Sequence, residues 1–260
     1  MRRTAFIVGV LPFTFAQTQT FKPSPGNFPA KADGDYAGGI FCIPLSELPQ
    51  YLNTGVPGGS EAPKGVGQAT TGSGPYSAQM IKDPSLPNHT LFVPKTPPMN
   101  LTMPFIAWGN GGCAKSPSNY VNFLIELASH GYVIAADGLT SNPGGTSAGA
   151  QTKVQDMRDS VDWAMKGGAA KYGDVDLTKI ATAGHSCGGL EAMSTAYHDD
   201  RVKRVVLFNI AIFQDDRRYL LQEIKVPVAW FVGGGSDMGF TTVRMLPPPH
   251  RHYYIAVPPY

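Results

Sequence analysis

Apolar runs and amphipathic segments alternate along most of this chain, beginning at about residue 76. Apolar runs of strand length occupy residues 76–81, 89–94, 103–109, 132–138, 179–184, 202–209 and 226–234. Segments in which apolar residues recur at helical spacing occupy residues 118–131, 153–166, 189–198 and 215–224. Buried strands that alternate with such helices are typical of a mostly parallel sheet with helices on both faces, and the first two runs predict a hairpin at its edge.

Composition divides the chain into four segments. Residues 17–75 are rich in Gly, Pro, Ser and Thr, which predicts irregular structure, and residues 76–245 carry the α/β pattern. Residues 246–260 form a proline-rich tail. A chain of 260 residues is long enough for one sizeable core, so we expect a single folded domain.

The first segment, residues 1–16, has the features of a secretory signal peptide. Arg2 and Arg3 precede an apolar stretch that runs from Ala5 to Ala16 and ends in small residues. A membrane anchor needs about 20 apolar residues, and this stretch is shorter. The pattern therefore predicts cleavage near Ala16 and a secreted, extracellular protein.

The net charge and the glycosylation sequons limit the classes of partner that the protein is expected to bind. Without Arg2 and Arg3 the chain has 19 basic and 19 acidic residues, so it is formally neutral. No basic stripe indicates a nucleic acid, and no later apolar run indicates a membrane. The triplets that begin at Asn88 and Asn100 are acceptors for N-glycosylation, which fits a secreted protein.

The segment "IATAGHSCGG" places Ser186 between a predicted strand and a predicted helix. A Gly-x-Ser-x-Gly turn in this context is the nucleophile elbow of the α/β-hydrolase fold, in which glycines permit close approach of neighbouring backbone. Amides at the helix N-terminus favour a developing negative charge. We expect Ser186 to be a nucleophile; the alternative is a plain strand-to-helix turn.

An acyl-transfer serine needs two amide donors for its tetrahedral oxyanion. The first donor is expected to be the amide of Cys187, the residue after the nucleophile. The second is expected from the loop "WGNGGC" after the third strand, and there we favour the amide of Gly112.

An acidic residue is required to orient the base of a triad. Asp237 follows the last predicted strand in a glycine-rich turn, which is the usual place of the acid in this fold. Asp215 is the alternative, although its position suggests a helix cap.

Three motifs that occur in this order resemble those of a known protein family. The stretches "WGNGGC", "GHSCGGLEA" and "GGGSDMGF", together with "DPSLPNHTLFVPK" and "ASHGYVIAADG", resemble a group of secreted fungal α/β-hydrolases related to cutinase-like, polyester-hydrolase and dienelactone-hydrolase enzymes. The resemblance spans about residues 74–239. It implies Ser186 as nucleophile, Asp237 as acid, and hydrolysis of an ester or similar acyl bond.

The chain has three cysteines, Cys42, Cys113 and Cys187. Cys113 and Cys187 each lie beside an expected oxyanion donor, so the two loops that must converge each carry a cysteine. We predict a disulfide between them, with Cys42 left free; two free buried thiols are the alternative.

The triad histidine should follow an eighth strand, but the sequence offers only His250 and His252 after the acid. They follow Asp237 by 13 and 15 residues (250 − 237 and 252 − 237), less than the ~20 residues that a helix, a strand and their loops require. We therefore expect the last strand and helix to be missing. His250 is retained as an improvised base.

The leading hypothesis is a secreted serine esterase that acts on small-molecule or polymeric esters, without a cofactor, and is impaired by the missing histidine. A catalytically silent relative that binds an acyl or aromatic ligand is the alternative. A metal site at "HRH", residues 250–252, lacks a third ligand, so no metal is expected. The sequence does not decide the acyl length or the oligomeric state.

Overall fold

The computed structural model describes residues 28–34, 37–43, 47, 69–140, 151–210, 212–233, 237, 239 and 252–257. The predicted signal peptide, residues 1–16, and His250 lie outside the described residues. Among the described residues, no helix is both long and apolar enough to span a bilayer.

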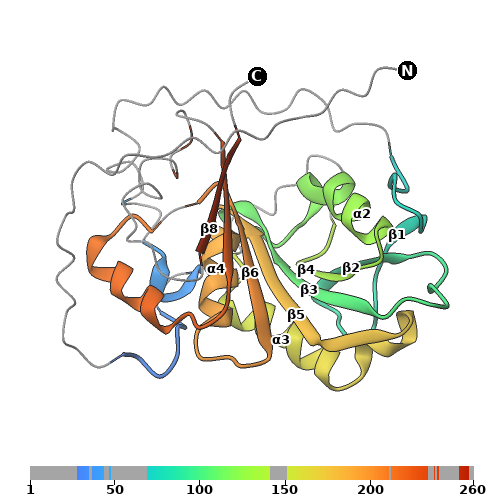
Figure 1. The fold of residues 1–260 in the computed structure, drawn as a ribbon, viewed down its shortest axis with the longest axis horizontal. Coiled ribbons are helices and arrows are strands. Elements are labelled where there is room, and N and C mark those ends of the chain that lie inside the picture. Colours follow the sequence, from blue (N-terminus) through green and yellow to red (C-terminus); the bar gives the residue numbers. More distant parts are fainter. Residues whose placement is uncertain are drawn as a thin grey trace, which may run out of the picture.

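An eight-stranded sheet forms the centre of the molecule, with the strand order β1-β2-β4-β3-β5-β6-β7-β8 (Figure 1). β1 pairs antiparallel with β2, and β2 pairs antiparallel with β4. The remaining neighbours are parallel. The strands are β1 (Ala78–Ile81), β2 (His89–Pro94), β3 (Met103–Gly109), β4 (Val133–Asp137), β5 (Val175–His185), β6 (Val202–Phe208), β7 (Val228–Gly233) and β8 (His252–Val257). The predicted α/β-hydrolase fold and its edge hairpin are confirmed.

Among the described residues, α-helices and several short 3-10 segments connect the strands. The α-helices are α2 (Val121–Ser129), α3 (Val154–Met165) and α4 (Cys187–Ala196). The 3-10 segments are η1 (Gly39–Phe41), η2 (Gly111–Cys113), η3 (Ser118–Tyr120), η4 (Gly168–Tyr172) and η5 (Asp215–Glu223). The segment at 215–224, expected as an amphipathic helix, is thus a 3-10 helix.

The helices cover opposite faces of the sheet. Leu124 of α2 packs in one apolar cluster with Trp108 and Ile134, whereas the larger cluster holds Met157 of α3 and Leu190 of α4. Alternate side chains of each central strand point into these two clusters because successive strand residues face opposite sides. The sheet is therefore a middle layer between α2 and the pair α3 and α4, as Figure 1 shows.

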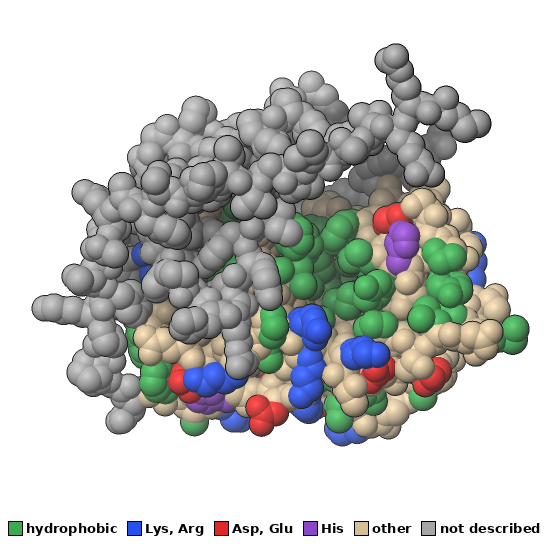
Figure 2. Space-filling view, viewed as in Figure 1, with side chains coloured by type: hydrophobic (Ala, Val, Ile, Leu, Met, Phe, Trp, Pro, Cys, Tyr) green, Lys and Arg blue, Asp and Glu red, His purple; other side chains and the backbone are tan. Residues whose placement is uncertain are grey.

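The two faces of β6 and β7 differ in burial. Leu207 and Trp230 are fully buried on the side of α4, whereas Phe208 and Phe231 are only half-buried on the side of α2. The Phe208 and Phe231 rings stack with centroids 5.1 Å apart. Figure 2 shows hydrophobic side chains gathered on the face seen in that view.

The expectation that the last strand is missing is wrong. β8 pairs in parallel with β7, from His252 opposite Val228 to Val257 opposite Gly233. Three of the five prolines in this tail, at residues 247–249, precede the strand, and the other two, Pro258 and Pro259, follow it. The aromatic and β-branched run between them suits a strand. The segment 246–260 therefore contains the last strand of the sheet.

Candidate active site

Ser186 lies at the turn between β5 and α4. Its backbone adopts φ 52° and ψ −124°, a conformation that L-residues rarely occupy and that a serine keeps only when the surroundings enforce it. The Ser186 amide donates to the Phe208 carbonyl at 2.9 Å, which ties the turn to the end of β6. Ser186 is half-buried rather than enclosed.

Three glycines make this turn possible. A Cβ at Gly188 would lie 2.0 Å from the carbonyl carbon of Gly109, and one at Gly184 would lie 2.2 Å from the Gly188 oxygen. A real Cβ never approaches backbone so closely, and backbone of a central strand cannot move aside. The close approach of β3, β5 and α4 therefore requires glycine at these positions.

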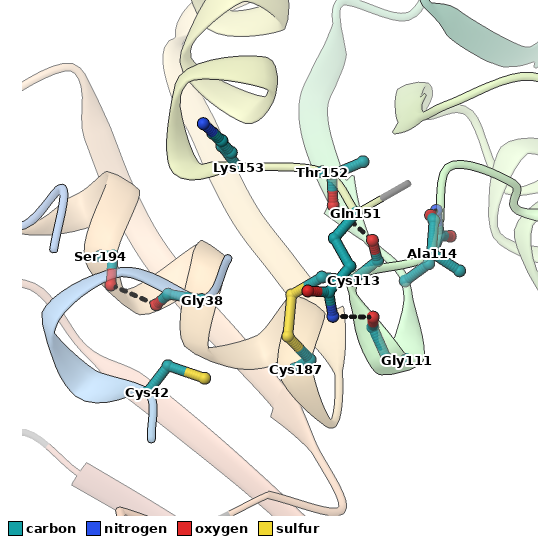
Figure 3. Close-up of a disulfide and its surroundings, with 12 residues drawn as sticks. Gly38, Cys42, Gly111, Cys113, Ala114, Gln151, Thr152, Lys153, Cys187 and Ser194 are labelled. Atoms are coloured by element: carbon teal, nitrogen blue, oxygen red, sulfur yellow. Dashed lines mark hydrogen bonds between the residues drawn. A yellow bond between two sulfur atoms is a disulfide. The ribbon is translucent and has the colours of Figure 1, made fainter. Parts of the chain in front are cut away.

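A disulfide joins the elbow to the loop after β3. Cys113 and Cys187 are bonded, with their Cα atoms 5.1 Å apart, whereas Cys42 is free and buried (Figure 3). The predicted pairing is confirmed. The bond brings the Gly112–Cys113 segment beside the residue that follows the nucleophile.

The backbone amides of this region can be assigned one by one. The Gly188 and Cys113 amides both donate to the Asn110 carbonyl at 3.0 Å, and the Gly111 amide donates to the Tyr120 hydroxyl at 2.9 Å. Within the described residues, the amides of Gly112 and Cys187 have no hydrogen-bond partner. These are the two amides that the sequence analysis expected as oxyanion donors, and that role stays a prediction.

Tyr120 and His185 form a polar pair that the sequence did not indicate. The Tyr120 hydroxyl lies 2.8 Å from Nδ1 of His185. Burial lowers the pKa of His185 against the opposing effect of the Asp237 charge, which favours the neutral ring. The Tyr120 hydroxyl oxygen accepts the Gly111 amide, so this amide is already paired.

Asp237 is held at the carboxyl end of β7. Its Oδ2 accepts the Gly233 amide at 2.8 Å, and its Oδ1 accepts the Gly239 amide at 2.7 Å. β6 separates β5, which leads to the elbow, from β7, which precedes Asp237. Asp215, the alternative acid, is the first residue of η5.

The backbone of β8 places His252 far from Ser186. His252 pairs with Val228 at the amino end of β7, whereas Ser186 follows the carboxyl end of β5. The length of β7, about 17 Å, separates the amino ends of the parallel strands from their carboxyl ends. His252 is therefore not beside the nucleophile, and His250 stays a prediction outside the described residues.

A buried acidic cluster lies below the loop after β3. His89 opens β2 and its Nε2 is 3.2 Å from Oδ1 of Asp137, while Glu191 of α4 is fully buried. Burial raises the pKa of Asp137 to about 6, although His89 acts against it. Burial raises the pKa of Glu191 well above its usual value, and the charge of Asp137 adds to this. The carboxyls of Asp137 and Glu191 therefore bind protons more tightly in the folded chain than in the unfolded chain.

We expect Glu191→Gln to raise the free energy of unfolding above that of the wild type, and to raise it more at pH 8 than at pH 4.5. A carboxyl whose pKa is raised on folding contributes stability below its unfolded pKa and loses it as pH rises toward the folded value. The gain over the wild type is therefore expected to be larger at pH 8, where the unfolded chain would ionise this carboxyl. Urea unfolding at both pH values measures it.

Glu126→Gln is the control for this experiment. Glu126 is exposed and its pKa is lowered by hydrogen bonds from Ser73, so its replacement should give no gain at pH 8. Equal effects of Glu191→Gln at both pH values would mean that the Glu191 carboxyl is not protonated in the fold.

Comparison with known proteins adds one finding to this geometry. A family model described as Chlorophyllase matches residues 70–212, which is more than half of the chain. The match includes the loop after β3 and the elbow with Ser186, and it ends before Asp237. No curated protein matches the chain in sequence.

Proposed function

The chain belongs to the chlorophyllase family, and from this premise we propose that it hydrolyses carboxylic esters through an acyl-enzyme on Ser186. The family is one of α/β-hydrolase-like esterases, in accord with the observed sheet order. The observation that carries the proposal is the half-buried Ser186 in its strained elbow, close to the amides of Gly112 and Cys187, which have no hydrogen-bond partner among the described residues.

The proposed reaction has two steps. Oγ of Ser186 attacks the ester carbonyl carbon and its proton passes to a base; the tetrahedral oxyanion accepts hydrogen bonds from the Gly112 and Cys187 amides. Collapse expels the alcohol, which takes up the proton and leaves an acyl-serine. Water then attacks the acyl carbon, the acid is released and Ser186 regains its proton.

We propose that this activity is weak, because the base is the weakest part of the site. His252 is the first residue of β8, at the amino ends of the parallel strands, whereas Ser186 lies at their carboxyl ends. Loss of one triad member lowers the rate by several orders of magnitude, but the oxyanion donors alone still give measurable catalysis. His250 is the predicted base, and the reaction is expected to be detectable with activated esters.

Secretion remains part of the proposal. Asn88 and Asn100 both have exposed side chains, and Asn100 lies in a turn just before β3, next to the highly exposed Met99. Both positions are open to a glycosyltransferase on the folded surface. The proposed substrate is a small or polymeric ester, and the finer resemblance to secreted fungal hydrolases stays a prediction.

A fluorophosphonate probe tests the nucleophile. We expect slow labelling over hours, mapped by peptide mass spectrometry to Ser186 alone, because this serine occupies the strained turn between β5 and α4. Ser186→Ala should remove the label completely.

Ser77→Ala is the matched control, since Ser77 is an exposed serine outside the elbow and should leave labelling unchanged. Labelling of another serine, or equal labelling of Ser186→Ala, would disprove the assignment. No labelling of the wild-type chain at any serine would favour the silent ligand-binding alternative.

A further inference from the structure

Asn110 is the first residue after β3 and is completely buried. All three polar positions of its side chain are used: Oδ1 accepts the indole N–H of Trp108 at 3.2 Å, and Nδ2 donates to the carbonyls of Ala114 at 2.8 Å and Asp137 at 2.7 Å. The side chain therefore connects the two ends of the loop 110–114 to each other and to the end of β4.

The backbone of the same residue extends this connection. The Asn110 carbonyl accepts the Cys113 amide within the loop and the Gly188 amide from the first turn of α4. One residue thus contacts β4, both ends of the loop and the helix that follows the nucleophile. These five hydrogen bonds determine which amides remain unpaired.

The loop needs such an anchor because its own conformation is unfavourable. Gly112 and Cys113 both have positive φ, 66° and 49°, and a residue other than glycine in that region costs of order 1 kcal/mol. A loop that must hold this shape in the absence of substrate requires contacts that oppose its relaxation.

We propose that Asn110 is the positioning residue of the oxyanion site: its side chain holds residues 110–114 so that the Gly112 amide is presented beside that of Cys187. The inference rests on the proposed ester hydrolysis for its catalytic consequence and on the hydrogen bonds alone for its structural part. Asparagine suits the position because only an amide of this length offers one acceptor and two donors there. Aspartate has no donor and would face two carbonyl oxygens.

The test compares acylation in four variants. Asn110→Ala and Asn110→Asp should label with fluorophosphonate at least ~10²-fold more slowly than the wild type, which is the usual cost of an oxyanion donor. With p-nitrophenyl acetate, kcat should fall while KM changes little. Asn119→Ala removes an exposed asparagine of η3 and should label at the wild-type rate.

Val202→Ala is a control that distinguishes loss of loop positioning from a general loss of protein stability. Val202 is buried at the amino end of β6, away from the loop, so its truncation should lower the melting temperature and leave the labelling rate unchanged. The proposal is overturned if Val202→Ala slows labelling as much as Asn110→Ala, or if both Asn110 variants label at the wild-type rate.

Hydrogen exchange keeps the two proposals distinguishable. In Asn110→Ala, the amides of Cys113 and Gly188 should exchange much faster than in the wild type, because their shared acceptor moves. Unchanged exchange would overturn the positioning role whatever the activity. If the wild type is not labelled at all, the proposed function fails, while faster exchange in the variant still supports Asn110 as the anchor of the loop.

Discussion

Gly188→Ala is expected to prevent the chain from folding stably. A methyl group at this position would lie 2.0 Å from the Gly109 carbonyl carbon and 2.2 Å from its oxygen. Both atoms belong to the end of β3, a central strand that is paired on both sides, so neither can shift without breaking the sheet. We expect a loss of at least ~4 kcal/mol, which is large compared with the stability of a typical domain.

Gly167→Ala is the matched control for Gly188→Ala. Gly167 has a φ of 88°, but a Cβ there would meet nothing within 4 Å, so alanine suffers only the unfavourable backbone conformation. The expected loss is about 1 kcal/mol. Urea unfolding and the yield of soluble protein measure both variants, and equal behaviour would show that β3 and α4 do not approach as closely as described.

Removal of the Cys113–Cys187 bond is expected to cost about 4 kcal/mol of unfolding free energy. The two residues are 74 positions apart, and closing a loop of that length restricts the unfolded chain by about this amount. The double variant Cys113→Ser, Cys187→Ser should unfold at a lower urea concentration than the wild type. Its acylation should also slow, because the loop with the Gly112 amide is then held by hydrogen bonds alone.

Cys42→Ala separates this effect from the loss of any cysteine. Cys42 is buried and free, so its replacement removes one small apolar group and no covalent link. Dithiothreitol should lower the unfolding midpoint of the wild type and of Cys42→Ala, and should leave that of the double variant unchanged. A wild-type midpoint that is insensitive to reduction would contradict the prediction.

Secondary structure was largely predictable because it depends on local periodicity. The runs at 103–109 and 132–138 are strands β3 and β4 within one or two residues, since continuous apolar runs of this length suit strands buried on both faces. The elbow was predictable for a similar reason, because its glycines and serine are adjacent in sequence. The segment at 215–224 differed in helix type.

The last strand shows where local reasoning failed. Counting residues after Asp237 led to the expectation that no further strand follows, whereas the run 252–257 is a strand paired with β7. The number of residues between two elements does not determine whether the second one pairs, because the partner strand supplies the hydrogen bonds.

The sequence by itself determined the strands up to β7 and the elbow at Ser186, because each depends on residues close together in the chain. It also indicated a bond between Cys113 and Cys187. Only the tertiary structure decided which amides stay free, since Gly111 is satisfied by Tyr120 and Gly188 by Asn110 from other elements. Burial, which raises the pKa of Glu191, likewise exists only after α4 packs on the sheet. Hydrogen bonding and desolvation between distant segments have no local sequence signal, and they decide the chemistry of the site.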